Sequence, residues 1–206
     1  MNETLTKAEK AVLQARLDAE KKVLKRLEKY YEEALGDIED KIAALLGRQD
    51  ANLPNVINRV EYQRLLKAQV ESALDKLHSS EYETIEKYLE DSYTDACVGT
   101  VFSLHDQEVP IIVPIDQNTA IKAVTVDTRL SKPLYASLGV DIQRLKMNIS
   151  AEITRGIASG LTYSAMTRNL SNVAKIPLGR ARTIVRTEAG RIQEQAIMDS
   201  MILVNR

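Results

Sequence analysis

The 206-residue sequence contains no tryptophan, one cysteine, one phenylalanine and two histidines. Because Cys97 is the single cysteine, an intrachain disulfide is excluded and synthesis in the cytosol is expected. His78 and His105 lie far apart in the sequence, and no metal-ligand spacing is present. Nothing in the sequence orients Cys97 and His105 as a nucleophile and its base. We therefore expect no metal, no cofactor and no catalytic residues.

Long apolar runs are also missing. The longest uncharged apolar stretches, residues 98–104 and 109–115, are far shorter than the roughly 18–20 residues that a membrane span needs. Residues 1–10 are polar, so we expect no secretory signal. Charged residues make up 28% of the chain and hydrophobic residues 44%, which is ordinary for a globular protein. The sequence predicts no association with a membrane.

The small net charge of −1 hides an asymmetry along the chain. Residues 1–97 hold 15 lysines and arginines against 20 acidic residues, whereas residues 98–206 hold 13 against 9. The front of the chain is therefore acidic and the back is basic.

The first part of the chain, residues 1–97, is typical of a long antiparallel helical hairpin. In the first helix, expected over residues 5–46, apolar side chains recur every seven residues, at Leu17, Leu24, Tyr31, Ile38 and Leu45. A second helix is expected over residues 55–96, with either a slip in its apolar stripe or a kink at residues 78–80. At 1.5 Å per residue, helices of about 40 residues would form an arm roughly 60 Å long.

Residues 98–130 have a different pattern, which predicts a small β insertion. Three short runs rich in β-branched residues, 98–104, 109–115 and 120–126, are separated by turn-forming side chains. Pro110 and Pro114 restrict the middle run to an edge strand or an extended loop.

Residues 131–206 predict a compact C-terminal helical unit. One helix is expected over residues 133–159 and ends at Gly160. Thr162 is a good N-cap for a short helix to residue 174, and residues 176–179 lead into a final helix. The predicted fold class is therefore mainly α, with a long N-terminal helical hairpin, a small β insertion and this C-terminal unit.

One residue of the final helix breaks its apolar face. Ala181, Ile184, Val185 and Ile192 share one side at 100° per residue, and Glu188 lies in the middle of that side. A carboxylate is costly there unless it is paired and hydrogen-bonded. We therefore expect Glu188 to contact a partner, such as an arginine, in another segment or another chain.

The same stretch resembles a known family. Residues 180–188, Arg-Ala-Arg-Thr-Ile-Val-Arg-Thr-Glu, are similar to the "ARTE" signature of phage minor head, or head-morphogenesis, proteins, which include the Mu F protein. Residues 138–160, including Arg144 at the arginine of the family's "RI" pair, resemble the family's upstream run. The family's preceding tryptophan is absent, and Lys132-Pro133-Leu134 stands in its place. The resemblance assigns the structural motif to Arg182, Arg186, Thr187 and Glu188.

This resemblance implies a virion protein of the phage capsid, made in the cytoplasm of the host bacterium and located in the head. It implies association with the portal protein, contacts with major capsid or scaffolding protein, and multiple copies. It further implies a non-catalytic role in procapsid assembly and in handling packaged DNA or delivering it during DNA ejection.

Basic residues cluster around the motif, at Lys175, Arg180, Arg182, Arg186 and Arg191. The interpretations that stay open are contact with the phosphates of double-stranded DNA, a solvated helix face, and contact with the acidic front of another subunit. No aromatic residues alternate with the basic ones, so any DNA binding should be to the backbone and independent of sequence.

Two alternatives come from other classes of protein. The first is a coiled-coil adaptor unrelated to phage heads, which the seven-residue repeats would fit equally well. The second is an enzyme of unrecognised type that uses Glu188. Substitution of Glu188 by glutamine separates them, because breaking a buried ion pair costs roughly 3–5 kcal/mol of stability whereas a catalytic carboxylate can be removed with little effect on folding.

Overall fold

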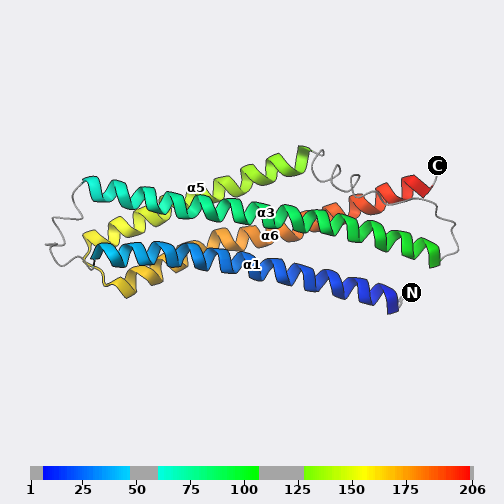
Figure 1. The fold of residues 1–206 in the computed structure, drawn as a ribbon, viewed down its shortest axis with the longest axis horizontal. Helices are drawn as coiled ribbons and strands as arrows, with labels where there is room; N and C mark the ends of the chain where they lie inside the picture. The colour runs from blue at the N-terminus through cyan, green and yellow to red at the C-terminus, as the bar shows by residue number, and fades with distance from the viewer. Residues whose placement is uncertain (1–6, 47–59, 107–127, 205–206) are drawn as a thin grey trace. The chain divides into compact units, whose positions relative to one another are not determined.

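The computed structural model describes residues 7–46, 60–106 and 128–204 of the chain, and within them every long element is a helix. Figure 1 labels the four helices: α1 (Lys7–Leu46), α3 (Val60–Asp106), α5 (Thr128–Ala158) and α6 (Tyr163–Val204). The mainly α prediction is therefore confirmed. Leucine, lysine, glutamate and alanine dominate α1, and these residues have high helix propensity.

The β insertion is not present in the described residues. Residues 98–104, predicted as its first strand, continue α3 to Asp106, so this prediction is wrong. The Thr100 hydroxyl donates to the Ala96 carbonyl at 2.8 Å, a bond to the preceding helical turn that makes a β-branched residue compatible with the helix. The other two predicted strands, residues 109–115 and 120–126, lie outside the described residues.

Two segments where the sequence predicted an irregularity lie inside uninterrupted helices. α3 runs without a break through residues 78–80. α6 runs through Pro177, where the sequence predicted a separate short helix and a linker. Proline lacks the amide that would bond to the Val173 carbonyl, a defect that costs about 3 kcal/mol in a helix interior. Pro177 is buried, as are Ala174 and Ala181 on the same side, and burial of this apolar face offsets the defect.

The turn between α5 and α6 confirms the predicted roles of Gly160, which ends α5, and Thr162, which caps α6. Gly160 has a positive φ of 62°, a conformation that favours glycine. The Leu161 amide donates to the Gly156 carbonyl at 2.8 Å, which closes the end of α5. The Thr162 hydroxyl accepts a bond from the Ala165 amide at 3.3 Å and caps α6.

The helices divide into two compact units that cut across the segments 1–97, 98–130 and 131–206. Unit 1 consists of Met1–Lys25, Glu83–Tyr135 and Arg182–Arg206, and unit 2 consists of Arg26–Tyr82 and Ala136–Ala181. Each unit contains a part of every helix in Figure 1.

Unit 2 has a hydrophobic core to which all four helices contribute. On each helix the buried residues follow a spacing of three and four, which places them on one face. They are Tyr31, Ala34, Ile38 and Ile42 on α1, Val70, Ala73, Leu74 and Leu77 on α3, Ile142, Leu145, Ile149 and Ile153 on α5, and Met166, Leu170 and Ala174 on α6.

The buried residues of unit 1 come mainly from α3 and α6. They include Ile85, Leu89, Tyr93, Ala96 and Cys97 on α3, Leu134 on α5, and Val185, Ala189, Ile192 and Ala196 on α6. Between residues 10 and 25 of α1 no described side chain is buried. Leu13 and Leu17 are 47% and 52% exposed, although Leu17 belongs to the same seven-residue repeat as Tyr31 and Ile38.

Candidate functional site

The motif assigned from the sequence lies on the unit 1 part of α6, within one uninterrupted helix. Arg186 and Thr187 are exposed, whereas Arg182 and Glu188 are half-buried. Val185 and Ala189 on the same helix are buried in unit 1. The motif therefore has an inner side that packs in unit 1 and an outer side, Arg186 and Thr187, that is open to a partner.

Glu188 has the arginine partner that its position demanded, but the partner is in the same helix. Arg191 Nε donates to Glu188 Oε2 at 3.1 Å, and the Glu188 side chain is 26% exposed. An i,i+3 pair of this kind follows from helix geometry alone. Arg191 lies on the same helix as Glu188, so a contact of Glu188 with another segment or another chain stays a prediction.

Arg186 connects α6 to α1 within unit 1. Arg186 Nε donates to Glu20 Oε1 at 2.8 Å, and the two side chains are 63% and 25% exposed. An ion pair this open to water contributes little stability, about 0–1 kcal/mol. A competing anion could therefore replace Glu20 at small cost.

Lys175 and Arg180, the other two basic residues of the predicted cluster, belong to unit 2. Lys175 Nζ donates to Asn172 Oδ1 at 2.9 Å. Arg180 forms an ion pair with Asp141 on α5, and Arg144 lies 4.0 Å from the same carboxylate. Arg144, the "RI" arginine of the resemblance, is thus placed beside Asp141 within unit 2.

A buried carboxyl group that the sequence interpretation missed lies in unit 2. Glu81 on α3 is 1% exposed, and Tyr31 on α1 donates its hydroxyl to Glu81 Oε1 at 3.2 Å. Among the described residues Glu81 Oε2 has no hydrogen-bond partner. Burial, and then the nearby Asp141 charge, raise the pKa of Glu81 to about 8, although the Tyr31 hydrogen bond acts in the opposite direction. Burial and the Glu81 charge also raise the pKa of Tyr31.

Glu81 interrupts the α3 stripe midway between Leu77 and Ile85, as Glu188 does between Ile184 and Ile192. The argument that singled out Glu188 therefore applied to Glu81 as well. Because residues 78–80 were interpreted as a slip in the apolar stripe, Glu81 was not recognised as a member of that stripe.

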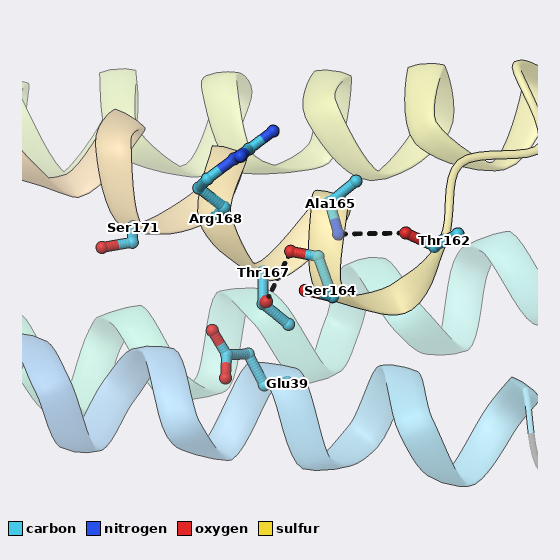
Figure 2. A pocket seen from close by; sticks show the side chains of 7 residues that line it. All are labelled: Glu39, Thr162, Ser164, Ala165, Thr167, Arg168 and Ser171. Atoms are coloured by element: carbon cyan, nitrogen blue, oxygen red, sulfur yellow. Dashed lines mark hydrogen bonds between the residues drawn. The ribbon is translucent and has the colours of Figure 1, made fainter.

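A polar hollow of about 540 Å³ lies at the start of α6 in unit 2. Figure 2 shows its lining: Glu39, Thr162, Ser164, Ala165, Thr167, Arg168 and Ser171. Two of its hydroxyl groups serve the helix itself, since Thr162 caps the Ala165 amide and Thr167 donates to the Ser164 carbonyl at 3.1 Å. The lining contains no histidine, and its charged side chains are Glu39 and Arg168.

The described residues contain no group of three or more histidine, cysteine, aspartate or glutamate side chains that could hold a metal ion. Nor does any helix among them combine the length and the apolar character needed to cross a bilayer.

Comparisons with protein-family models, curated proteins and solved structures gave no match to this chain. The likeness to phage head proteins therefore depends on the residues of its own sequence, chiefly Arg182, Arg186, Thr187 and Glu188.

Proposed function

We propose that this chain is a phage minor head protein that associates with the portal and acts, without catalysis, in procapsid assembly and in handling or delivery of packaged DNA. The observation that carries the proposal is the placement of the ARTE-like stretch. It lies on one continuous helix, with Val185 and Ala189 buried and with Arg186 and Thr187 exposed. A recognition motif needs this combination of a fixed backbone and an open side.

Under this proposal the protein is made in the cytoplasm of the host bacterium and resides in the virion head in several copies. Portal protein is its principal partner, and major capsid or scaffolding protein is a further one. Arg186 is the residue of unit 1 best suited to meet an acidic surface or a phosphate, because its partner Glu20 is held only by an exposed ion pair.

The experiment is co-sedimentation of the purified full chain with the portal protein encoded beside it, at low and moderate salt. We expect a complex that Arg186→Glu weakens at least tenfold. Arg168→Glu is the matched control, since Arg168 is also an exposed arginine of α6 but lies outside the motif. The absence of a complex at both salt concentrations would refute the proposal.

Direct contact with double-stranded DNA is tested separately. If the α6 arginines bind phosphates, the affinity of the chain for DNA should fall steeply with salt and should be the same for unrelated sequences. Arg186→Gln should reduce the slope of that salt dependence by about one phosphate contact. An unchanged slope would leave portal association as the role of Arg186.

The second candidate is a coiled-coil adaptor unrelated to phage heads, and one observation favours it. Leu17, at a repeat position of α1, and Leu13, one turn before it, are about half exposed and could pack against a partner helix. Such a protein would form a defined oligomer alone and would not bind the portal protein.

A further inference from the structure

We propose that Tyr31, Glu81 and Asp141 form a proton switch that controls the attachment of α1 in unit 2. While the Glu81 carboxyl group carries a proton, α1 stays packed against α3, and loss of that proton releases α1 before unit 1 opens. The switch takes one residue from each of three helices, α1, α3 and α5. The inference does not rest on the proposed function, because it uses only contacts within the chain.

The contacts that hold α1 in place are concentrated in unit 2. Among the described side chains of α1, the buried hydrophobic ones all belong to that unit. They are Leu27, Tyr31, Ala34, Ile38 and Ile42. In unit 1 no described side chain between residues 10 and 25 of α1 is buried, and the ion pair of Glu20 with Arg186 is exposed. The attachment of α1 is therefore determined mainly in unit 2.

Among these contacts, the Glu81 carboxyl group is the one that ionisation disturbs. Glu81 is 1% exposed, and its Oε1 accepts a hydrogen bond from the Tyr31 hydroxyl at 3.2 Å. In the described part of the chain Glu81 Oε2 has no hydrogen-bond partner, and no lysine or arginine pairs with this carboxyl group. A buried carboxylate with one hydrogen bond and no cation is costly, whereas its protonated form is neutral. The protonated form is therefore the one that fits the closed core.

Asp141 on α5 adds a second carboxylate that opposes ionisation of Glu81. After burial, the Asp141 charge raises the pKa of Glu81, and it also raises the pKa of Tyr31. The side chain of Asp141 is 14% exposed and pairs with Arg180 on α6, and Arg144 lies 4.0 Å from the same carboxylate. These two cations are thus placed at Asp141, which reaches water, and not at Glu81.

The other groups around Glu81 do not supply a positive charge either. His78 lies three residues before it on α3. Burial lowers the pKa of His78, the Asp75 charge acts in the opposite direction, and the Lys146 charge lowers that pKa again, so His78 is mainly neutral at pH 7. Lys146 is itself paired with Asp75 at 2.7 Å. The residues that α6 adds to this core cannot ionise; they are Met166, Leu170 and Ala174.

An ionised Glu81 therefore has to be stabilised by water, and the contact between α1 and α3 is where water can enter. The hydrogen bond from Tyr31 to Glu81 crosses that contact. About one turn away lies a small hollow of about 20 Å³, enough for roughly one water molecule, and Ala34 on α1 and Leu77 on α3 help to line it. Separation of α1 from α3 at this place hydrates Glu81 and exposes the buried face of α1.

Unit 1 is expected to stay closed under the same conditions. Both oxygens of its Asp199 carboxylate are hydrogen-bonded, one to the Tyr93 hydroxyl and the other to the Gln195 amide, each at 2.8 Å. Asp199 is only partly buried, so it can be ionised in the folded chain. A rise in pH to 8.5 therefore adds no unsatisfied charge to the contact between α3 and α6.

Amide hydrogen exchange of the full wild-type chain, measured by mass spectrometry at pH 6 and pH 8.5, tests the proposal. Protection factors are obtained by dividing out the exchange rate of an unstructured peptide at each pH. We expect the protection of residues 27–42 of α1 to fall at least about tenfold between the two pH values. The protection of residues 185–196 of α6, in unit 1, should change less than about twofold.

Three variants assign the effect to the switch. Glu81→Gln should abolish the pH difference in α1, and Asp141→Asn should reduce it, because removal of the Asp141 charge favours ionisation of Glu81 in the closed state. The matched control is Glu83→Gln, an exposed carboxylate two residues further along α3, which should keep the difference of the wild-type chain. Circular dichroism at pH 6 establishes that each variant is folded.

Two results with the wild-type chain would overturn the proposal without any variant. One is unchanged protection of α1 between pH 6 and pH 8.5. The other is an equal loss of protection in α1 and α6, which indicates that the whole chain opens together. A pH difference that persists in Glu81→Gln would also overturn it, because another group would then control the release of α1.

Discussion

Units 1 and 2 use the same helix differently. Tyr31 and Ile38 of α1 are 3% and 0% exposed in unit 2, whereas Leu17, at the same repeat position, is 52% exposed in unit 1. In unit 2 the other three helices all add residues to the core against which this face packs. A seven-residue pattern therefore determines which side of a helix is apolar, but not whether anything covers that side.

The units also differ in their internal polar contacts. In unit 2 the Glu81 carboxyl is buried beside Tyr31. In unit 1 the Tyr93 hydroxyl donates to Asp199 Oδ2 at 2.8 Å, and this pair is only partly buried. A buried carboxyl must stay protonated or lose stability, whereas a carboxylate that reaches water can remain charged. The comparison predicts that pH acts mainly on unit 2.

The largest expected effect is therefore the pH dependence that Glu81 confers. Its pKa of about 8 in the folded chain lies above the ordinary value of 4.5, so the folded state binds a proton that the unfolded state has lost. The contribution of this bound proton to the free energy of unfolding is fully present below pH 4.5. It is lost as the pH rises to about 8, and the loss is at most roughly 5 kcal/mol. Urea unfolding followed by circular dichroism from pH 5 to 9 measures this loss.

Glu81→Gln should remove most of that pH dependence, because the amide cannot ionise. At pH 9 this variant should be more stable than the wild-type chain. Tyr31→Phe is the companion variant, since it deletes the hydrogen bond to Glu81 but leaves the titrating group in place. If Glu81→Gln keeps the slope of the wild-type chain, Glu81 is not its source.

The next largest effect is the loss of stability expected from alanine substitutions at two positions of α1. Ile38→Ala should destabilise the chain by about 2–5 kcal/mol, because it leaves a cavity in the closed core of unit 2. Leu17→Ala should cost less than about 1 kcal/mol, since roughly half of the side chain is already in water. Equal losses in thermal unfolding would show that α1 is as well covered in unit 1 as in unit 2.

A smaller change in stability is expected from alanine substitutions at two glycines, one in each unit. A β-carbon at Gly156 in unit 2 would lie 2.7 Å from both Cγ and Sδ of Met166, so Gly156→Ala should destabilise by about 1–3 kcal/mol. At Gly99 in unit 1 the nearest atoms are 3.7 Å away, and Gly99→Ala should stabilise by up to about 1 kcal/mol through helix propensity. Melting temperatures that shift in the same direction for both variants would contradict this comparison.

The smallest expected effect concerns the ion pair between Arg186 and Glu20 in unit 1. Arg186→Gln should change the free energy of unfolding by less than about 1 kcal/mol, because the pair with Glu20 is exposed. The same variant should weaken portal binding if Arg186 acts at the surface. A large loss of stability would instead assign Arg186 a structural role within unit 1.

Much of the local structure could be predicted from the sequence. The stripes that form the core, the cap at Thr162 and the turn at Gly160 all follow from short-range rules, which depend on neighbours within a few residues. The positions of Arg182, Arg186 and Glu188 on the last helix were predictable for the same reason. The i,i+3 pair of Glu188 with Arg191 also follows from helix spacing. The pairing of Arg186 with Glu20, which lies 166 residues away, could not be predicted, because several acidic residues were equally available.

The errors occurred where tertiary packing outweighs local preference. Residues 98–104 are rich in β-branched residues, yet they continue a helix whose preceding turn, at Ala96 and Cys97, is buried in unit 1. Pro177 normally ends a helix, yet its burial keeps α6 continuous. The partner of Glu81 is 50 residues away along the chain, a distance that no periodicity can reveal.

The rate at which a reagent labels the Cys97 thiol can be used to follow motions of unit 1. Cys97 is the only thiol of the chain, it is 6% exposed, and its sulfur faces the Ala196 carbonyl at 3.7 Å. A thiol reagent can reach it only when the packing of α3 on α6 opens, so the labelling rate reports that opening and nothing else in the chain. Motions of unit 1 can thus be timed in the wild-type protein. A partner that holds α3 against α6 will lower the labelling rate of Cys97.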